Sequence, residues 1–218
     1  AKDATMPELF VDIGATTREE AEAKVQIGDV AVYVTNFVEM GSRVSSGALD
    51  DRIACAAVVE AFRTMQNVHD VYAVFTVQEE VGLRGAGAAA YAIEPDLNIS
   101  LDVTGTGDTP KCGRMSVKLG AGATVKVMDS SVIVPPVVRA FLAEAADGKN
   151  IRWQPEVLRA GGTDTGAVQR TRGGILSGCI SIPTRYIHSP VETADMGDYE
   201  AAVQLVCAAV AKQELPHR

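Results

Sequence analysis

The chain has few cysteines, few aromatic residues and no long apolar run. Its 218 residues include four cysteines, and none of them belongs to a C-x-x-C pair. This spacing is typical of reduced thiols in a cytoplasmic protein rather than of a disulfide framework. No apolar run approaches the roughly 18–20 residues that a membrane-spanning helix needs. The sequence therefore predicts a cytoplasmic protein that has no membrane partner.

Positive charge is also scarce. The chain carries 20 Lys and Arg against 28 Asp and Glu, which gives a formal net charge of −8. A nucleic-acid partner is excluded, because no stripe of basic residues is present to displace counterions from phosphates. A serine nucleophile is unsupported, because the sequence contains no G-x-S-x-G motif.

Strands and helices alternate along most of the chain. Apolar residues at helical spacing predict a helix over 51–66, and apolar runs predict strands over 71–77, 98–103 and 175–182. Such alternation favours an α/β fold around a mixed sheet. The other predicted helices are 85–93, 130–146, 164–171 and 197–214, and the other strands are 115–119, 124–128 and 151–157.

The beginning of the chain has a different pattern. Short apolar runs predict strands over 9–13 and 30–34. Thr16 and Thr17 each have a glutamate three residues later, which predicts the start of an acidic helix. Small and polar residues accumulate over 41–47. We therefore expect a small β-rich module over residues 1–45 and a main domain over residues 46–218.

Acidic residues and a histidine follow three of the predicted strands. Sites in open α/β sheets form outside the carboxyl ends of the strands, so these groups could converge. Each of them alone also fits an ordinary role, such as a helix cap or a solvent-exposed turn. Together, however, several carboxylates at one place repel one another unless a cation binds them, and Asp, Glu and His suit Zn, Co or Mn. Of two adjacent glutamates, one can bind a metal while the other takes a proton from water. The candidates are Asp50, Glu79, Glu80, Asp102 and His188.

Six short motifs that contain these residues follow one another along the chain. They are G-A-L-D-D-R at 47–52, V-Q-E-E-V-G at 77–82, L-D-V-T at 101–104, G-D-T-P at 107–110, G-G-T-D at 161–164 and I-P-T-R-Y-I-H-S-P at 182–190. In this order they resemble the glutamyl/deblocking aminopeptidase family of dinuclear metallopeptidases, the tetrahedral aminopeptidases. The likeness extends over nearly the whole chain.

The resemblance implies a role for each candidate. It implies that Asp50 bridges two metal ions and is followed by a cis peptide bond, that Glu80 and His188 bind one ion, and that Asp102 binds the other. It makes Glu79 the general base for a water activated by the two metals, which hydrolyses the N-terminal residue of a peptide. No substrate-binding residue is assigned.

The resemblance also implies an architecture and partners. The fold would be an α/β/α metallopeptidase catalytic domain, incomplete at its N-terminal side, with residues 1–45 as part of a small β-rich dimerisation domain. The cofactors would be two divalent ions, Zn or Co. The partners would be short peptides and further copies of the chain, from a dimer to a dodecamer.

One family motif is missing from the sequence. The family carries an H-x-D motif upstream of the bridging aspartate, whereas none of His69, His188 and His217 lies in such a motif. One metal site is therefore short of a ligand, and it could be empty or weak. Two interpretations remain open: a part of a longer active peptidase, or a natural short form that is catalytically impaired and acts as an assembly or peptide-binding subunit. A carboxypeptidase or an amide deacylase of the same architecture is a rival enzyme class.

Overall fold

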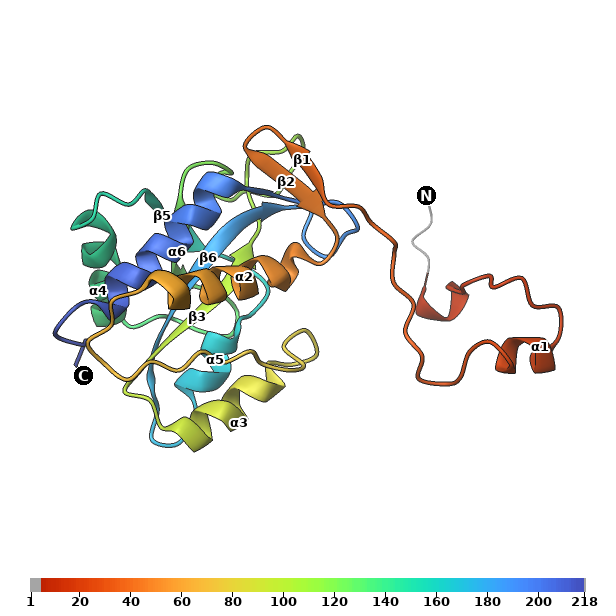
Figure 1. Cartoon of the computed structure of the whole chain (residues 1–218), viewed down its shortest axis with the longest axis horizontal. Helices are drawn as coiled ribbons and strands as arrows, with labels where there is room; N and C mark the ends of the chain where they lie inside the picture. The colour runs from red at the N-terminus through yellow and green to blue at the C-terminus, as the bar shows by residue number, and fades with distance from the viewer. Residues whose placement is uncertain (1–4, 218) are drawn as a thin grey trace. The chain divides into compact units, whose positions relative to one another are not determined.

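A mixed seven-stranded sheet forms the centre of the larger part of the chain (Figure 1). The computed structural model describes residues 5–217, and the chain divides into two compact units, 1–34 and 35–218. Parallel pairs join β3 to β6 and β4 to β5, and antiparallel pairs join β4 and β7 to β6. The predicted α/β fold with a mixed sheet is confirmed. The strands are β1 (Val38–Met40), β2 (Arg43–Ser46), β3 (Leu97–Thr104), β4 (Ala123–Met128), β5 (Trp153–Val157), β6 (Leu176–Arg185) and β7 (Glu192–Asp195).

The helices of the larger unit pack on this sheet through two apolar clusters. Helices α2 and α6 contact each other, α4 contacts α6, and all three share the main cluster with the strands (Figure 1). Ile53, Ala57 and Ala61 lie at helical spacing in α2 and are buried, as the periodicity predicted. Helices α3 and α5 form the second, smaller cluster. No helix of the described residues is long and apolar enough to cross a membrane. The helices are α2 (Leu49–Thr64), α3 (Arg84–Ile93), α4 (Pro136–Asp147), α5 (Asp164–Gln169) and α6 (Met196–Val210).

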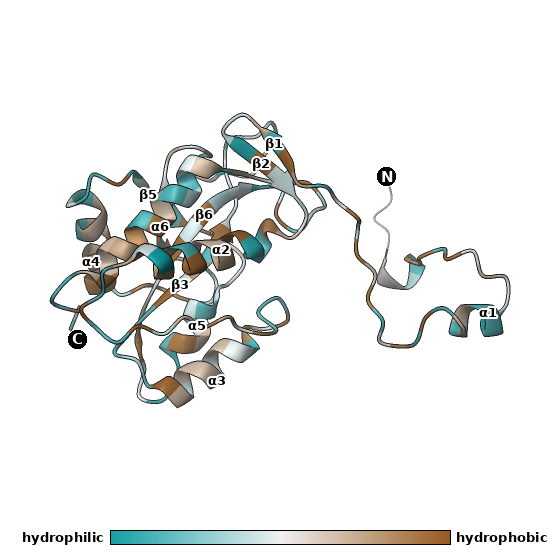
Figure 2. Cartoon of the chain, in the orientation of Figure 1, coloured by the Kyte–Doolittle hydropathy of each residue, from teal (hydrophilic) through white to brown (hydrophobic). Residues whose placement is uncertain are grey.

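The smaller unit contains a short 3-10 helix, Met6–Glu8, and α1, Arg18–Glu22. The predicted helix cap is confirmed, because Thr17 Oγ1 accepts a hydrogen bond from the Glu20 N–H at 3.2 Å, and α1 is hydrophilic (Figure 2). The predicted strands over 9–13 and 30–34 are wrong. A strand needs a partner backbone, and no strand pairs with either run among the residues described, which leaves Phe10 87% exposed.

Among residues 5–45, which the structure describes, β structure is confined to the β1–β2 hairpin. This hairpin pairs through β2 with β7 and so belongs to the larger unit, which begins at Thr35. The module boundary at residue 45 stays a prediction; it falls inside β2, and the division of the chain into compact units lies between Val34 and Thr35.

Two further predicted strands are absent from the described structure for related reasons. No described strand pairs with 71–77, and Phe75 and Val77 are more than half exposed. In the segment 115–119, the backbone of Lys118 bonds to a side chain instead of a strand. The Gln154 amide accepts the Lys118 N–H at 3.0 Å and donates to the Lys118 carbonyl at 2.8 Å. An apolar run alone therefore did not determine strand formation at either place.

A buried polar network connects the central strands. Glu156 on β5 is fully buried, and its carboxylate accepts hydrogen bonds from Lys126 Nζ on β4 and from three hydroxyl groups. The hydroxyl donors are Thr104 at 2.9 Å, Thr124 at 2.6 Å and Ser181 at 2.7 Å. The network therefore holds β3, β4, β5 and β6 together, and Lys126 Nζ also lies 3.4 Å from Asp129 Oδ2.

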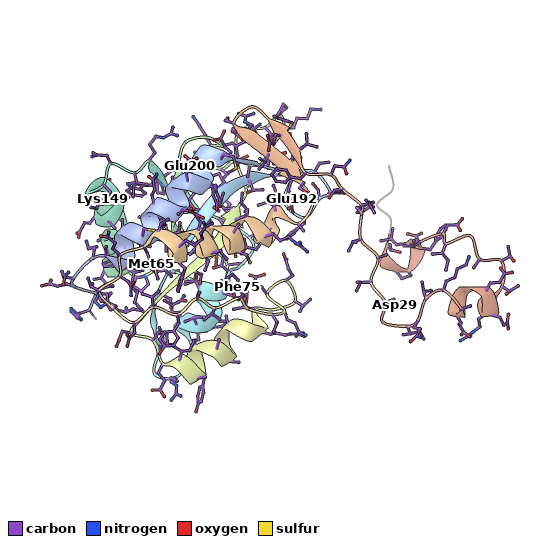
Figure 3. All side chains as sticks on the ribbon, viewed as in Figure 1. Asp29, Met65, Phe75, Lys149, Glu192 and Glu200 are labelled. Carbon is purple, nitrogen blue, oxygen red and sulfur yellow. The ribbon has the colours of Figure 1, made fainter. Side chains whose placement is uncertain are left out.

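Replacing Lys126 by methionine is expected to lower the free energy of unfolding by about 3–5 kcal/mol, because it leaves the buried Glu156 carboxylate without its counter-charge. Lys149→Met is the matched control, since Lys149 is exposed (Figure 3) and its loss should change stability by less than about 0.5 kcal/mol. Urea unfolding followed by circular dichroism measures both variants. Equal stabilities would show that the buried pair does not stabilise the sheet.

Candidate metal centre

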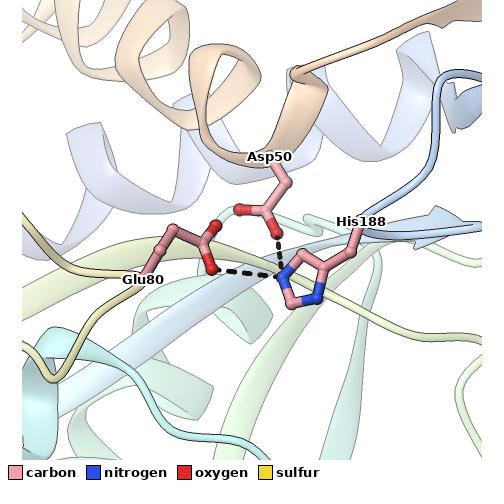
Figure 4. A group of neighbouring side chains, drawn as sticks. All are labelled: Asp50, Glu80 and His188. Carbon is pink, nitrogen blue, oxygen red and sulfur yellow. Dashed lines mark ion pairs between the residues drawn. The ribbon is translucent and has the colours of Figure 1, made fainter. Parts of the chain in front are cut away.

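Three side chains from distant segments meet at one point near the start of α2 (Figure 4). His188 Nε2 lies 3.1 Å from Asp50 Oδ2 and 3.3 Å from Glu80 Oε2. Each of the three residues offers one ligand atom, and these atoms all lie within 4.8 Å of one another. The side chain of Asp50 is 9% exposed, whereas those of Glu80 and His188 are 56% and 69% exposed. Asp50 therefore lies at the buried side of the group, whereas Glu80 and His188 lie at the side that is open to solvent.

Backbone conformation at the element ends brings these residues together. Ala48 precedes α2 in a left-handed conformation, and the peptide bond from Asp50 to Asp51 is cis, as the resemblance implied. Glu80 lies in the turn before α3. His188 follows β6 and also has a left-handed backbone, with φ of 62°.

A second group of possible ligands contains Asp50, Asp51 and Asp102. Asp102 lies on β3, opposite Ser181 of the parallel strand β6. Asp51 Oδ1 is buried and has no hydrogen-bond partner among the described residues. An orphaned buried carboxylate oxygen is costly unless a donor or a cation satisfies it. Asp50 belongs to both groups, so the structure places it between them.

The sequence did not assign Asp51 to the site. Its position next to Asp50 was the available signal, but one of two adjacent acids at a helix start is commonly a cap. Asp164, which ends the G-G-T-D motif, was also not assigned to the site, although its charge helps to raise the pKa of Glu79. Asp164 Oδ2 accepts a hydrogen bond from Thr76 Oγ1 at 2.6 Å.

Crowding changes the acidity of these carboxyl groups. Burial, followed by the charge of Glu80, raises the pKa of Asp50 to about 6. Burial, followed by the charge of Asp164, raises the pKa of Glu79 to about 7. Burial and neighbouring acids also raise the pKa values of Asp51 and Asp102 well above the usual range. Ionised carboxylates are thus unfavourable here without a cation.

The donor set fits a divalent cation. Carboxylate oxygens with one imidazole suit zinc, cobalt or manganese, and bound positive charge would relieve the repulsion between the acids. The structure brings together four predicted ligands, Asp50, Glu80, Asp102 and His188, in two groups that share Asp50. The other two histidines belong to neither group found among the described residues.

Without metal, the protein is expected to lose thermal stability as the pH rises from about 4 to 8. A carboxyl group with a raised folded-state pKa stabilises the fold below its unfolded value, and this contribution is lost as the pH rises through the folded value. For Asp50 this interval runs from 3.8 to about 6, and for Glu79 from 4.5 to about 7. A loss of 1 kcal/mol corresponds to about 2–4 °C for a chain of this size.

Melting temperatures measured in chelator and in saturating zinc across this pH range test the expectation. The decline should be several degrees in chelator, about 2–4 °C for each kcal/mol lost, and smaller in zinc, because bound cations favour the ionised carboxylates. An equal fall in melting temperature in chelator and in zinc would show that these acids do not bind an ion.

Comparison with known proteins agrees with the motifs. The family model described as M42 glutamyl aminopeptidase matches residues 1–205. A putative aminopeptidase of Acetivibrio thermocellus is 52% identical over 210 residues, which cover 96% of this chain and 64% of that protein. The chain thus spans about two thirds or less of the curated relatives it matches.

Solved structures show the same relation. An aminopeptidase from the archaeon Desulfurococcus kamchatkensis superposes with a TM-score of 0.92 at 38% identity, covering 97% of this chain and 61% of that chain. The TET1 peptidase of Pyrococcus horikoshii, which can assemble into a tetrahedron or a large octahedral shell, gives a TM-score of 0.78 at 33% identity, covering 92% of this chain and 60% of that chain. The matched family model and these similarities show that the chain belongs to the M42 glutamyl aminopeptidase family.

Proposed function

We propose that this protein is a metal-dependent aminopeptidase, which hydrolyses the peptide bond after the first residue of a peptide. The observation that carries the proposal is the convergence of Asp50, Glu80, Asp102 and His188 in two ligand groups that share Asp50. Glu79 directly precedes Glu80 in the chain, and the charges of Glu80 and Asp50 contribute to raising its pKa. Family membership supports the reaction class.

Each ligand is proposed to have a separate role. Asp50 would bridge two divalent ions, zinc or cobalt, with Glu80 and His188 on one ion and Asp102 on the other. Ions held in this way supply Lewis acidity, which polarises the scissile carbonyl and lowers the pKa of water. Asp51, with its orphaned oxygen, is a further candidate ligand on the side of Asp102.

Glu79 is proposed to act as the general base. Its carboxyl group belongs to neither ligand group, so it is free to accept a proton, and burial together with nearby acids raises its pKa above the ordinary value when no cation is bound. Its carboxylate would take a proton from the attacking water as the oxygen bonds to the scissile carbon. The same group would then give the proton to the leaving amine as the C–N bond breaks.

Family membership favours a substrate with a free N-terminus. An aminopeptidase acts at a free α-amine, which an N-acylated peptide lacks. We therefore propose short peptides with a free amine as substrates, in preference to the N-acyl substrates of a deacylase.

Self-association and cellular location are proposed on other grounds. Assembly of the similar TET1 peptidase supports a homo-oligomer for this protein. The four cysteines are free thiols, which supports the cytoplasmic location expected from their spacing.

An activity assay with the protein expressed from the complete reading frame tests the proposal. Aminoacyl-p-nitroanilides should be hydrolysed, and their N-acetylated counterparts should not. Activity should fall to background in 1,10-phenanthroline and return with zinc or cobalt. Hydrolysis that resists the chelator would contradict a metal-dependent reaction. A protein that binds metal without turnover would instead support the interpretation of a catalytically impaired subunit.

A further inference from the structure

A buried carboxylate lies between the backbones of two proposed metal ligands. Glu192, the first residue of β7, is 2% exposed. Its Oε2 accepts the backbone N–H of Asp50 at 2.9 Å, and its Oε1 accepts the backbone N–H of His188 at 2.8 Å. One side chain therefore joins the start of α2 to the loop that follows β6.

Glu192 is itself held by the sheet. It is paired with Ser46 of β2 in the antiparallel ladder of β2 and β7. A carboxylate fixed in this way can set the positions of groups that bond to it, because both of its oxygens point at backbone donors. Hydrogen bonds to an ionised acceptor are also stronger than neutral ones.

The His188 backbone needs such support. Its φ of 62° lies in the left-handed region, which is strained for a residue with a side chain. The bond from its N–H to Glu192 is a local contact that offsets this strain. Without it, the loop would be freer to move the imidazole away from Asp50.

Direct metal binding is not the role that the geometry favours for Glu192. Both of its oxygens are occupied by backbone donors, and neither ligand group found among the described residues includes it. We propose that Glu192 is a positioning residue, which holds the backbones of Asp50 and His188 so that their side chains reach the same ion. This inference rests on the proposed metal centre.

Glu192→Gln tests the role with little change in volume. The amide keeps one acceptor oxygen and places an NH₂ donor against the second N–H, so one of the two bonds is lost. Loss of a group that orients a ligand typically lowers metal affinity by about 10–100-fold. We expect that fall for zinc, together with a changed visible absorption spectrum of the cobalt-loaded protein.

Asp198 offers a matched control in the same chain. It is fully buried, and its carboxylate also accepts two backbone N–H groups, from Gly120 at 2.7 Å and from Gly122 at 2.6 Å. It belongs to neither ligand group. Asp198→Asn should therefore lower the melting temperature much as Glu192→Gln does, but leave zinc affinity and the cobalt spectrum unchanged.

Zinc titration against a chromophoric chelator and cobalt spectroscopy are applied to the wild type and both variants. Wild-type zinc affinity and cobalt spectrum in Glu192→Gln would overturn the inference, as would equal losses of affinity in both variants. If the wild type binds no ion, both the inference and the proposed function fail. If the wild type binds zinc and Glu192→Gln binds it equally well, only the inference fails. If Glu192→Gln does not fold, Glu192→Asp is used, because its shorter side chain reaches only one of the two donors. The same fall in affinity is then expected, and an unchanged affinity overturns the inference.

Discussion

Replacing Glu79 by glutamine is expected to lower kcat by about 10²–10⁴-fold, because that is the typical contribution of a general base. Glutamine has nearly the same shape but cannot take a proton from water. Glu79 is in neither ligand group, so the metal content and KM should remain close to those of the wild type. Steady-state kinetics with an aminoacyl-p-nitroanilide and elemental analysis of the same samples measure both quantities.

The adjacent residue provides the contrast. Glu80→Gln alters a carboxylate that lies 3.3 Å from His188 Nε2, so it should reduce metal content as well as turnover. Comparison of the two variants therefore distinguishes a general base from a metal ligand at consecutive positions. A near-normal rate in Glu79→Gln, or a loss of metal equal to that in Glu80→Gln, would reject the role assigned to Glu79.

The parts of the site that the sequence predicted are those with a local signal. Asp102 lies near the carboxyl end of β3 and His188 follows β6, and the ends of these parallel strands meet at one edge of the sheet. Helix α2 was predicted from its apolar periodicity, and this helix places Asp50 at its start. These residues could be grouped because each depends on neighbours within a few positions.

Residues that act through the backbone gave no such signal. Glu192 is 142 residues from Asp50 in sequence, and a side chain that accepts the backbone N–H of so remote a residue follows no residue pattern. Asp51 is the neighbour of Asp50 in the G-A-L-D-D-R motif, but only the three-dimensional structure places it with Asp102. Such contacts depend on the arrangement of whole elements.

Strand prediction failed where a partner was required. The runs at 9–13, 30–34 and 71–77 have the apolar residues of strands, yet no described strand pairs with them. The prediction of the α1 cap was correct because the hydrogen bond from the Glu20 N–H to Thr17 lies within one turn. Local hydrogen bonds can be predicted from adjacent residues, whereas a sheet edge depends on segments that are remote in sequence.

Replacing Asp50 by asparagine is expected to weaken metal binding at both groups, whereas Asp102→Asn should weaken mainly one. Asp50 is the residue that the two groups share, and Asp102 belongs to one of them. Loss of a group that orients a ligand typically lowers metal affinity by about 10–100-fold. Loss of a direct ligand should lower the affinity by at least as much. Elemental analysis after dialysis at limiting zinc measures the occupancy of each variant, with Asp96→Asn as the exposed control outside both groups.

The pattern of losses decides whether Asp50 acts as the bridge. A bridging carboxylate neutralises both ions, so its amide should leave two like charges close together with one fewer anion between them. Binding of the second ion should then suffer more than binding of the first, and zinc titration of Asp50→Asn should show the second step displaced to higher concentration. In Asp102→Asn the tighter of the two steps should survive, because Glu80, His188 and Asp50 remain in contact. Equal losses in the two variants would contradict the shared position of Asp50 and reduce the centre to one ion.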